Sequence, residues 1–174
     1  MADAKTVLLT AFAVNQPAQL QDIDDIAQGF PRELGRRLAA GRQFAIRSSH
    51  ELLSWDWQQG APEPRLLQQL SAATDSRYIV AGEIRNAGIF IQKKFFGLWN
   101  TSKRSMEVEI RVYDARSGTL LARHDLAKTI DGAVTVGREH VFGGAGFVAT
   151  PFGAAIAQLL DEAAQAVGND LRQQ

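Results

Sequence analysis

Residues 105–130 read SMEVEIRVYDARSGTLLARHDLAKTI, and they carry the clearest secondary-structure pattern of the chain. Four apolar side chains recur at every second position: Met106, Val108, Ile110 and Val112. The residues between them are predicted to face water: Glu107, Glu109, Arg111 and Tyr113. Such alternation is typical of a strand with one buried face. Residues 114–119 supply Asp and Gly for a turn, and residues 120–130 return as a second strand, so the segment predicts a β-hairpin.

The segments before this hairpin alternate between strand and helix. Residues 6–14, TVLLTAFAV, form an almost continuous apolar run, which predicts a strand buried on both faces. Apolar residues at spacings of three and four predict a helix over residues 22–40, with Asp22, Asp24 and Asp25 at its start. The remaining predicted elements are a short strand at 44–47, a loop at 58–64, a helix at 63–74 and a strand at 78–84 that continues through 89–91.

A loop around residues 93–103 and a glycine-rich connection at 131–150 complete the predicted pattern, before a last helix. Thr150 is expected to cap that helix and Pro151 to lie in its first turn. Its apolar side chains form one stripe: Ile156, Leu159, Leu160, Ala163, Val167 and Leu171. The order β-α-β-α-β-β-β-α predicts an α/β fold in which helices flank a mixed β-sheet, as a single domain over residues 1–174.

Composition excludes several classes of protein. The 174 residues include no cysteine, so disulfide frameworks, cysteine-ligated zinc, iron–sulfur clusters and thiol nucleophiles are ruled out. Lysine and arginine number 19, as do aspartate and glutamate, and this zero net charge does not indicate nucleic acid as a partner. No apolar run approaches the roughly 20 residues that span a bilayer. A chain without net charge lacks one defence against self-association, so a homo-oligomer is left open.

Sequence motifs give little support for catalysis. The three histidines, His50, His124 and His140, are too far apart to share metal-ligand spacing on one element. The glycine-rich residues 143–147 lack the spacing of a phosphate-binding loop. We therefore expect no catalytic residue, metal or cofactor. The alternative from another class is a small-molecule-binding or hydrolytic enzyme that uses His124 or His140 with the acidic strand residues.

Residues 90–104, FIQKKFFGLWNTSKR, have the most unusual local composition. They carry four positive charges and no negative charge, interleaved with four aromatic side chains. Two interpretations weigh most: a hairpin tip whose aromatics pack onto the domain, and a protein-contact surface, since aromatic residues are enriched in interface hot spots. Single-stranded nucleic acid or lipid headgroups are the weaker readings. The candidate contact residues are Lys93, Lys94, Phe95, Phe96 and Trp99.

Four segments together resemble a known family of envelope domains. They are residues 18–47 (AQLQDIDDIAQGFPRELGRRLAAGRQFAIR), 73–84 (ATDSRYIVAGEI), 108–121 (VEIRVYDARSGTLL) and 147–156 (FVATPFGAAI). In order and spacing they resemble the TolB N-terminal-like and curli-secretion CsgG-like domains. Within that group, the hairpin and the last segment look most like the middle domain of the flagellar assembly protein FlgT.

This resemblance implies an exported, periplasmic protein without catalytic residues, whose signal sequence has been removed. It implies partners among other envelope or flagellar proteins, most of all in assembly of the flagellar basal body and motor. Membrane association would come through those partners or through a removed N-terminal anchor, not through a spanning segment. The alternatives within the same fold are an activator of peptidoglycan synthases and a component of curli-type secretion.

Overall fold

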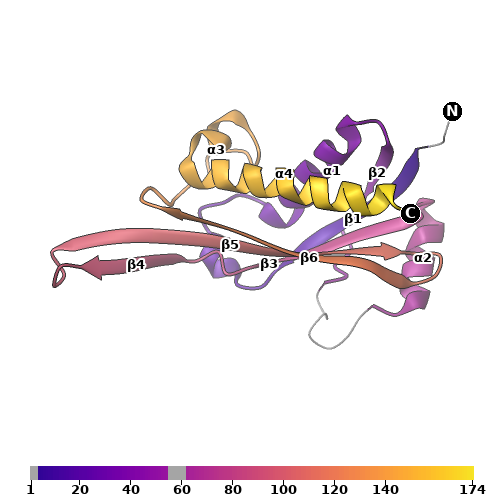
Figure 1. The fold of residues 1–174 in the computed structure, drawn as a ribbon, viewed down its shortest axis with the longest axis horizontal. Helices are drawn as coiled ribbons and strands as arrows, with labels where there is room; N and C mark the ends of the chain where they lie inside the picture. Colours follow the sequence, from indigo (N-terminus) through magenta and orange to yellow (C-terminus); the bar gives the residue numbers. More distant parts are fainter. Residues whose placement is uncertain (1–3, 55–61) are drawn as a thin grey trace.

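A six-stranded mixed sheet forms the centre of the computed structural model, which describes residues 4–54 and 62–174 (Figure 1). Its strands are β1 Lys5–Val14, β2 Phe44–Ser48, β3 Tyr78–Arg85, β4 Ile89–Lys94, β5 Trp99–Asp114 and β6 Thr119–Asp131. β1 pairs in parallel with β2 and β3, whereas β5 pairs antiparallel with β3, β4 and β6. The parallel pairs follow from helical crossovers, and tight turns join the antiparallel pairs β4–β5 and β5–β6. The predicted mixed sheet is confirmed.

Helices cover both faces of the sheet. They are α1 Ile26–Ala40, α2 Pro64–Thr74, α3 Ala145–Ala149 and α4 Pro151–Arg172, with a short 3₁₀ turn at Pro17–Leu20. α1 and α4 lie side by side over one face (Figure 1), where the main core gathers. The predicted stripe of α4 is buried there in full, and the Thr150 side chain accepts a hydrogen bond from the Gly153 N–H at 3.1 Å, which confirms the predicted cap. Among residues 4–54 and 62–174, no helix is long and apolar enough to cross a bilayer.

Two predicted elements need correction. The helix expected over residues 22–40 begins only at Ile26, and the aspartates before it lie in turns. The loop expected around residues 93–103 is mostly strand, because β4 is a separate strand and β5 already begins at Trp99. Within residues 4–54 and 62–174, the structure therefore contains one strand, β4, and one short helix, α3, more than the predicted order. Most of the loop expected at 58–64 lies outside the described residues.

The second face of the sheet is drier than its alternating pattern indicates. Tyr113 and Glu109, both predicted to face water, are only 2% exposed. A second core covers this face where α2 packs on it: Leu8, Leu53, Leu67, Ile79, Ala81, Tyr113 and Ala115. The buried face of β5, with Met106, Val108, Ile110 and Val112, is confirmed. The prediction was wrong because alternation of apolar and polar residues indicates only that the two faces of a strand differ. It does not indicate whether another element covers the polar face.

Candidate functional site

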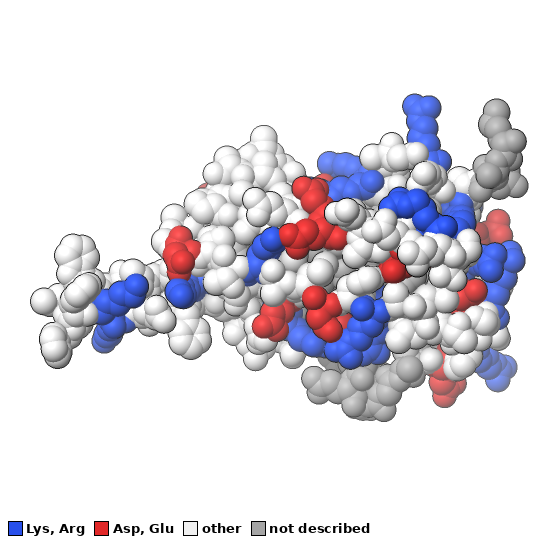
Figure 2. Space-filling model, in the orientation of Figure 1, with Lys and Arg blue, Asp and Glu red and all other residues white. Residues whose placement is uncertain are grey.

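A two-stranded ribbon projects from one end of the sheet (Figures 1 and 2). It consists of β4 and the first residues of β5, paired from Ile89↔Arg104 to Lys94↔Trp99. The connecting residues 95–98 form a tight turn in which Phe95, Phe96 and Gly97 all have positive φ. The start of β1 and the end of α4 lie at the opposite end of the molecule (Figure 1). The ribbon is therefore the part of the described chain most distant from the termini.

The apolar side chains of the ribbon face solvent. Phe90 is 73% exposed, Trp99 is 65% exposed and Phe96 is fully exposed. Ile91, Phe95 and Leu98 are also exposed, as are Lys93 and Lys94. The interpretation that these aromatics pack down onto the domain is wrong, because the ribbon extends beyond the helices that cover the rest of the sheet. All five candidate contact residues lie at the surface, and their role in a contact stays a prediction.

The charge of the ribbon has one sign. From residue 88 to residue 106 the sequence contains no aspartate or glutamate. Lys93 and Lys94 are exposed, and Lys103 is partly exposed with its Nζ 3.9 Å from Asp131 Oδ1. In Figure 2 the projecting end of the molecule shows positive side chains (blue) among mostly uncharged atoms, whereas the body shows positive and negative side chains intermixed. The ribbon thus combines exposed aromatic rings with an uncompensated positive charge.

Arg104 fixes the root of this ribbon to the body. Its side chain is completely buried, and its guanidinium donates to both carboxylate oxygens of Asp22, at 2.7 and 2.8 Å. The remaining guanidinium hydrogens are donated to the carbonyl oxygens of Gln19, Ala87 and Val134. The ring of Phe152 lies beneath it, with its centroid 4.3 Å from the guanidinium carbon. A buried charge with this set of partners is fully satisfied.

Asp22 is held in its charged form. Burial by itself would raise the pKa of this carboxyl, but the hydrogen bond and charge of Arg104 oppose it, as does the Val136 N–H, which donates at 2.9 Å. The balance keeps the pKa of Asp22 below its ordinary value. Sequence reasoning missed this pair. One sequence signal was available. Arg104 lies two residues before Met106 and four before Val108, so its side chain falls on the same, buried face of β5.

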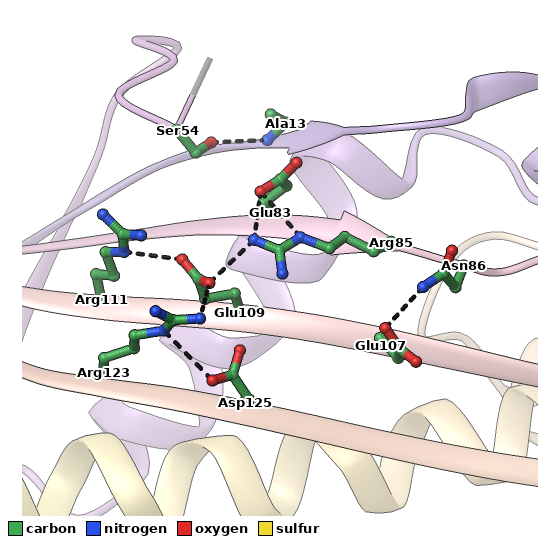
Figure 3. A network of polar contacts seen from close by, with 10 residues as sticks. All are labelled: Ala13, Ser54, Glu83, Arg85, Asn86, Glu107, Glu109, Arg111, Arg123 and Asp125. Carbon is green, nitrogen blue, oxygen red and sulfur yellow. Dashed lines mark hydrogen bonds and ion pairs between the residues drawn. The ribbon is translucent and has the colours of Figure 1, made fainter. Parts of the chain in front are cut away.

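A second ionic cluster lies on the opposite face of the sheet (Figure 3). The buried carboxylate of Glu109 receives Arg85, Arg111 and Arg123 at 2.7 to 2.9 Å. Arg85 also donates to Glu83, and this hydrogen bond raises the pKa of Arg85 although burial opposes it. The two glutamates are adjacent because β3 and β5 pair Glu83 with Glu109. Arginines thus neutralise two carboxylates that would otherwise repel, which indicates a structural role.

The histidines do not assemble the site that the enzyme hypothesis requires. His124 contacts Asp170 of α4 and none of the acidic residues of the strands, and His140 lies 3.6 Å from the neighbouring Glu139. Within the described residues, no group of three His, Asp or Glu side chains is placed to hold a metal ion. Two hollows of about 430 and 530 Å³ lie elsewhere, beside the start of β1 and beside the ribbon, and no histidine lines either one.

Sequence comparison finds one family. The sequence model described as "Flagellar assembly protein T, middle domain" matches residues 3–137, which is most of the chain. The match includes the ribbon and its root, and it ends before α3 and α4, so it does not reach the resembling segment at residues 147–156. No curated protein matches the sequence at a significant level.

Solved structures show that the fold recurs. A hypothetical protein from Chlamydia trachomatis superposes with a TM-score of 0.67 at 18% identity, covering 99% of this chain and 100% of that one. A protein from Xanthomonas campestris gives a TM-score of 0.62 at 9% identity, with coverages of 98% and 87%. The PelC dodecamer from Paraburkholderia phytofirmans gives 0.50 at 15% identity, with coverages of 94% and 89%. At these identities the likeness concerns the fold alone.

Proposed function

Because the chain belongs to the family of the flagellar assembly protein T middle domain, we propose that it is a non-enzymatic protein-binding module of a cell-envelope assembly. Family membership suggests flagellar assembly as the process. We place the module in the periplasm, at the flagellar basal body and motor. In this proposal residues 1–174 act as one unit, and the partners are other flagellar or envelope proteins.

The observation that carries the proposal is the projecting ribbon. Soluble proteins rarely leave contiguous apolar surface uncovered, and exposed aromatics rimmed by polar groups are typical of interaction sites. Here Phe90, Phe96 and Trp99 are exposed together on a segment that contributes nothing to either core. Aromatic side chains of this kind dominate the energy of protein interfaces. The contact residues are therefore Lys93, Lys94, Phe95, Phe96 and Trp99.

The state of the two ionic clusters supports a binding role over a catalytic one. The carboxylates of the two ionic clusters are engaged by arginines, and a general acid or base needs a group that is free to exchange a proton with a substrate. Self-assembly is compatible with the fold, since the solved PelC protein is a dodecamer. We keep oligomerisation as a second property that the same module can have.

The test replaces the two most prominent aromatic side chains of the ribbon. Phe96→Ala/Trp99→Ala should weaken binding of the purified protein to isolated flagellar basal bodies at least about thirtyfold, the loss expected for one hot-spot residue. Swimming of cells that carry the double variant should fall in parallel. The matched control is Val141→Ala, which shortens an apolar side chain that is 71% exposed but lies outside the ribbon.

The circular dichroism spectrum and melting temperature of the double variant should equal those of the parent, because both side chains lie outside the cores. Unchanged binding and swimming in a correctly folded double variant would remove the ribbon as the contact surface.

A further inference from the structure

The outer edge of β4 carries unpaired hydrogen-bonding groups. β4 is the last strand in the sheet order, and its only partner strand among the described residues is β5. In an antiparallel pair, successive residues direct their N–H and C=O alternately toward the partner and away from it. Gly132 N–H donates to the Ser102 carbonyl on the β6 side of β5. In the ribbon part of β5, the backbone N–H and C=O groups of the even-numbered residues are therefore directed toward the β6 side, away from β4.

It follows which residues of β4 point outward. Thr101 and Lys103 of β5 face Gln92 and Phe90, so these pairs exchange the ladder hydrogen bonds. The N–H and C=O groups of Ile89, Ile91 and Lys93 are therefore directed to the free edge. All six residues of β4 are exposed. An exposed apolar edge strand is a template for another strand, and natural proteins usually blunt such edges. Within the described residues this edge has no proline and no covering element. It does carry Lys93 and Lys94, and lysines of this kind discourage pairing with a basic strand but not with an acidic one.

We propose that β4 receives an extended segment of another protein as an added strand, and that this segment is acidic where it meets Lys93 and Lys94. The inference rests on the proposed function and specifies how the contact is made. Main-chain hydrogen bonds along the edge would give affinity, and side-chain contacts to the ribbon would give specificity. The other free edge, β5 beyond the end of β6, is shorter, because the Ser102 carbonyl is already paired and Asp131 lies beside Lys103.

Charge selects the occupant. Residues 88–106 contain no acidic residue, and the charge of Arg104 is consumed by Asp22, so Lys93 and Lys94 are left to face the solvent. An acidic segment would neutralise these two charges, whereas a second copy of β4, which contains no acidic residue, would not. Both lysines lie at the C-terminal end of β4. In an antiparallel addition, the first residues of the incoming strand are opposite them, so its acidic residues should come first in its sequence.

The experiment uses the full chain and synthetic peptides. The probe is the labelled peptide Asp-Glu-Val-Thr-Val-Thr, and the charge control is Lys-Lys-Val-Thr-Val-Thr. We expect the acidic probe to bind at least about tenfold more tightly, with an affinity that falls as salt is added. On binding, the amides of Ile89, Ile91 and Lys93 should gain protection from hydrogen exchange. The amides of Phe90, Gln92 and Lys94, already bonded to β5, should change little.

Two variants separate strand addition from side-chain contact. Ile91→Pro removes an outward N–H without breaking the ladder to β5, which is where proline is tolerated, and it should weaken probe binding at least about tenfold. Ile91→Thr keeps the N–H and the β-branched shape, so it should bind within about twofold of the parent, since only an exposed side chain changes.

Four results would overturn the inference: no binding of the acidic probe at millimolar concentration, equal binding of both probes, uniform protection along β4, or full binding by a folded Ile91→Pro variant. Self-association that Ile91→Pro abolishes would make a second copy the occupant and would also overturn it. Full binding of basal bodies by Ile91→Pro, together with loss of binding by Phe96→Ala/Trp99→Ala, would leave the proposed function standing and remove only strand addition.

Discussion

Asp22→Asn is the sharpest test of how the ribbon is held. The substitution keeps the shape of the side chain and removes the charge that compensates Arg104, whose side chain has no exposure to solvent. Removal of one partner from a buried ion pair costs about 3–5 kcal/mol. The Asp22 side chain is itself 24% exposed, and asparagine would still accept one hydrogen bond from Arg104. We therefore expect the free energy of unfolding to fall by about 3 kcal/mol, at the lower end of this range. With a urea m-value of about 2 kcal/mol per M, the unfolding midpoint should fall by about 1.5 M.

The cost of this substitution should depend on pH in a definite direction. The pKa of Asp22 in the folded protein lies below its ordinary value of 3.8, so the carboxylate contributes stability that is fully present above that ordinary value. The contribution is lost as the pH falls through the folded pKa. The difference in unfolding free energy between the parent and Asp22→Asn should therefore be constant near neutral pH and should shrink below about pH 4.

Urea unfolding followed by circular dichroism measures both effects, with Asp24→Asn as the matched control. Asp24 pairs with Arg138 at 2.8 Å, but both side chains are more than half exposed, so its loss should cost less than about 1 kcal/mol. The reasoning fails if Asp22→Asn costs less than about 1 kcal/mol, or if Asp24→Asn costs as much, because burial of Arg104 would then not decide the energy.

Two further substitutions test other parts of the structure. Glu109→Gln should lower the free energy of unfolding in urea by about 2–3 kcal/mol, because three arginines contact this buried carboxylate (Figure 3). The control Glu107→Gln changes an exposed side chain and should lower it by less than about 0.5 kcal/mol. Equal losses in the two variants would show that the cluster contributes nothing to stability. Thr150→Ala should cost about 1 kcal/mol through loss of the cap of α4, and Thr150→Ser should restore most of it; a thermal melt with no change in Thr150→Ala would contradict the role of the cap.

Sequence patterns predicted the parts of the fold whose residues bury a regular face. The apolar run of β1 and the helical stripe of α4 fill the main core, so their periodicity reports directly on burial. β4 escaped detection as a strand of its own because no layer covers the ribbon, and an uncovered strand has no buried face to impose alternation. The exposure of Phe96 and Trp99 could not be predicted from the sequence either, because the presence of an aromatic residue does not by itself indicate whether it lies in a core or at the surface.

The ionic contacts depended on pairings that the local sequence does not contain. Arg104 was counted among four positive charges available to a partner, yet its charge is consumed by Asp22, 82 residues earlier in the chain. Asp22 in turn was assigned to a helix start, where acidic residues are favoured, although the helix begins at Ile26. In both cases the local sequence pattern suggested a role for the residue, but the fold brought an oppositely charged residue from a distant segment beside it, and that ion pair determines its role.

β5 is continuous from the tip of the ribbon to the turn before β6, and this has a mechanical consequence. Its sixteen residues span about 54 Å as one extended strand, bonded along its length to β3, β4 and β6. A pull on the tip along the strand direction would load these ladders in shear, so that many hydrogen bonds would have to break together. Because β5 begins at the exposed Trp99, next to the turn with Phe95 and Phe96, it can transmit tension from a bound partner into the core without first unfolding at the root.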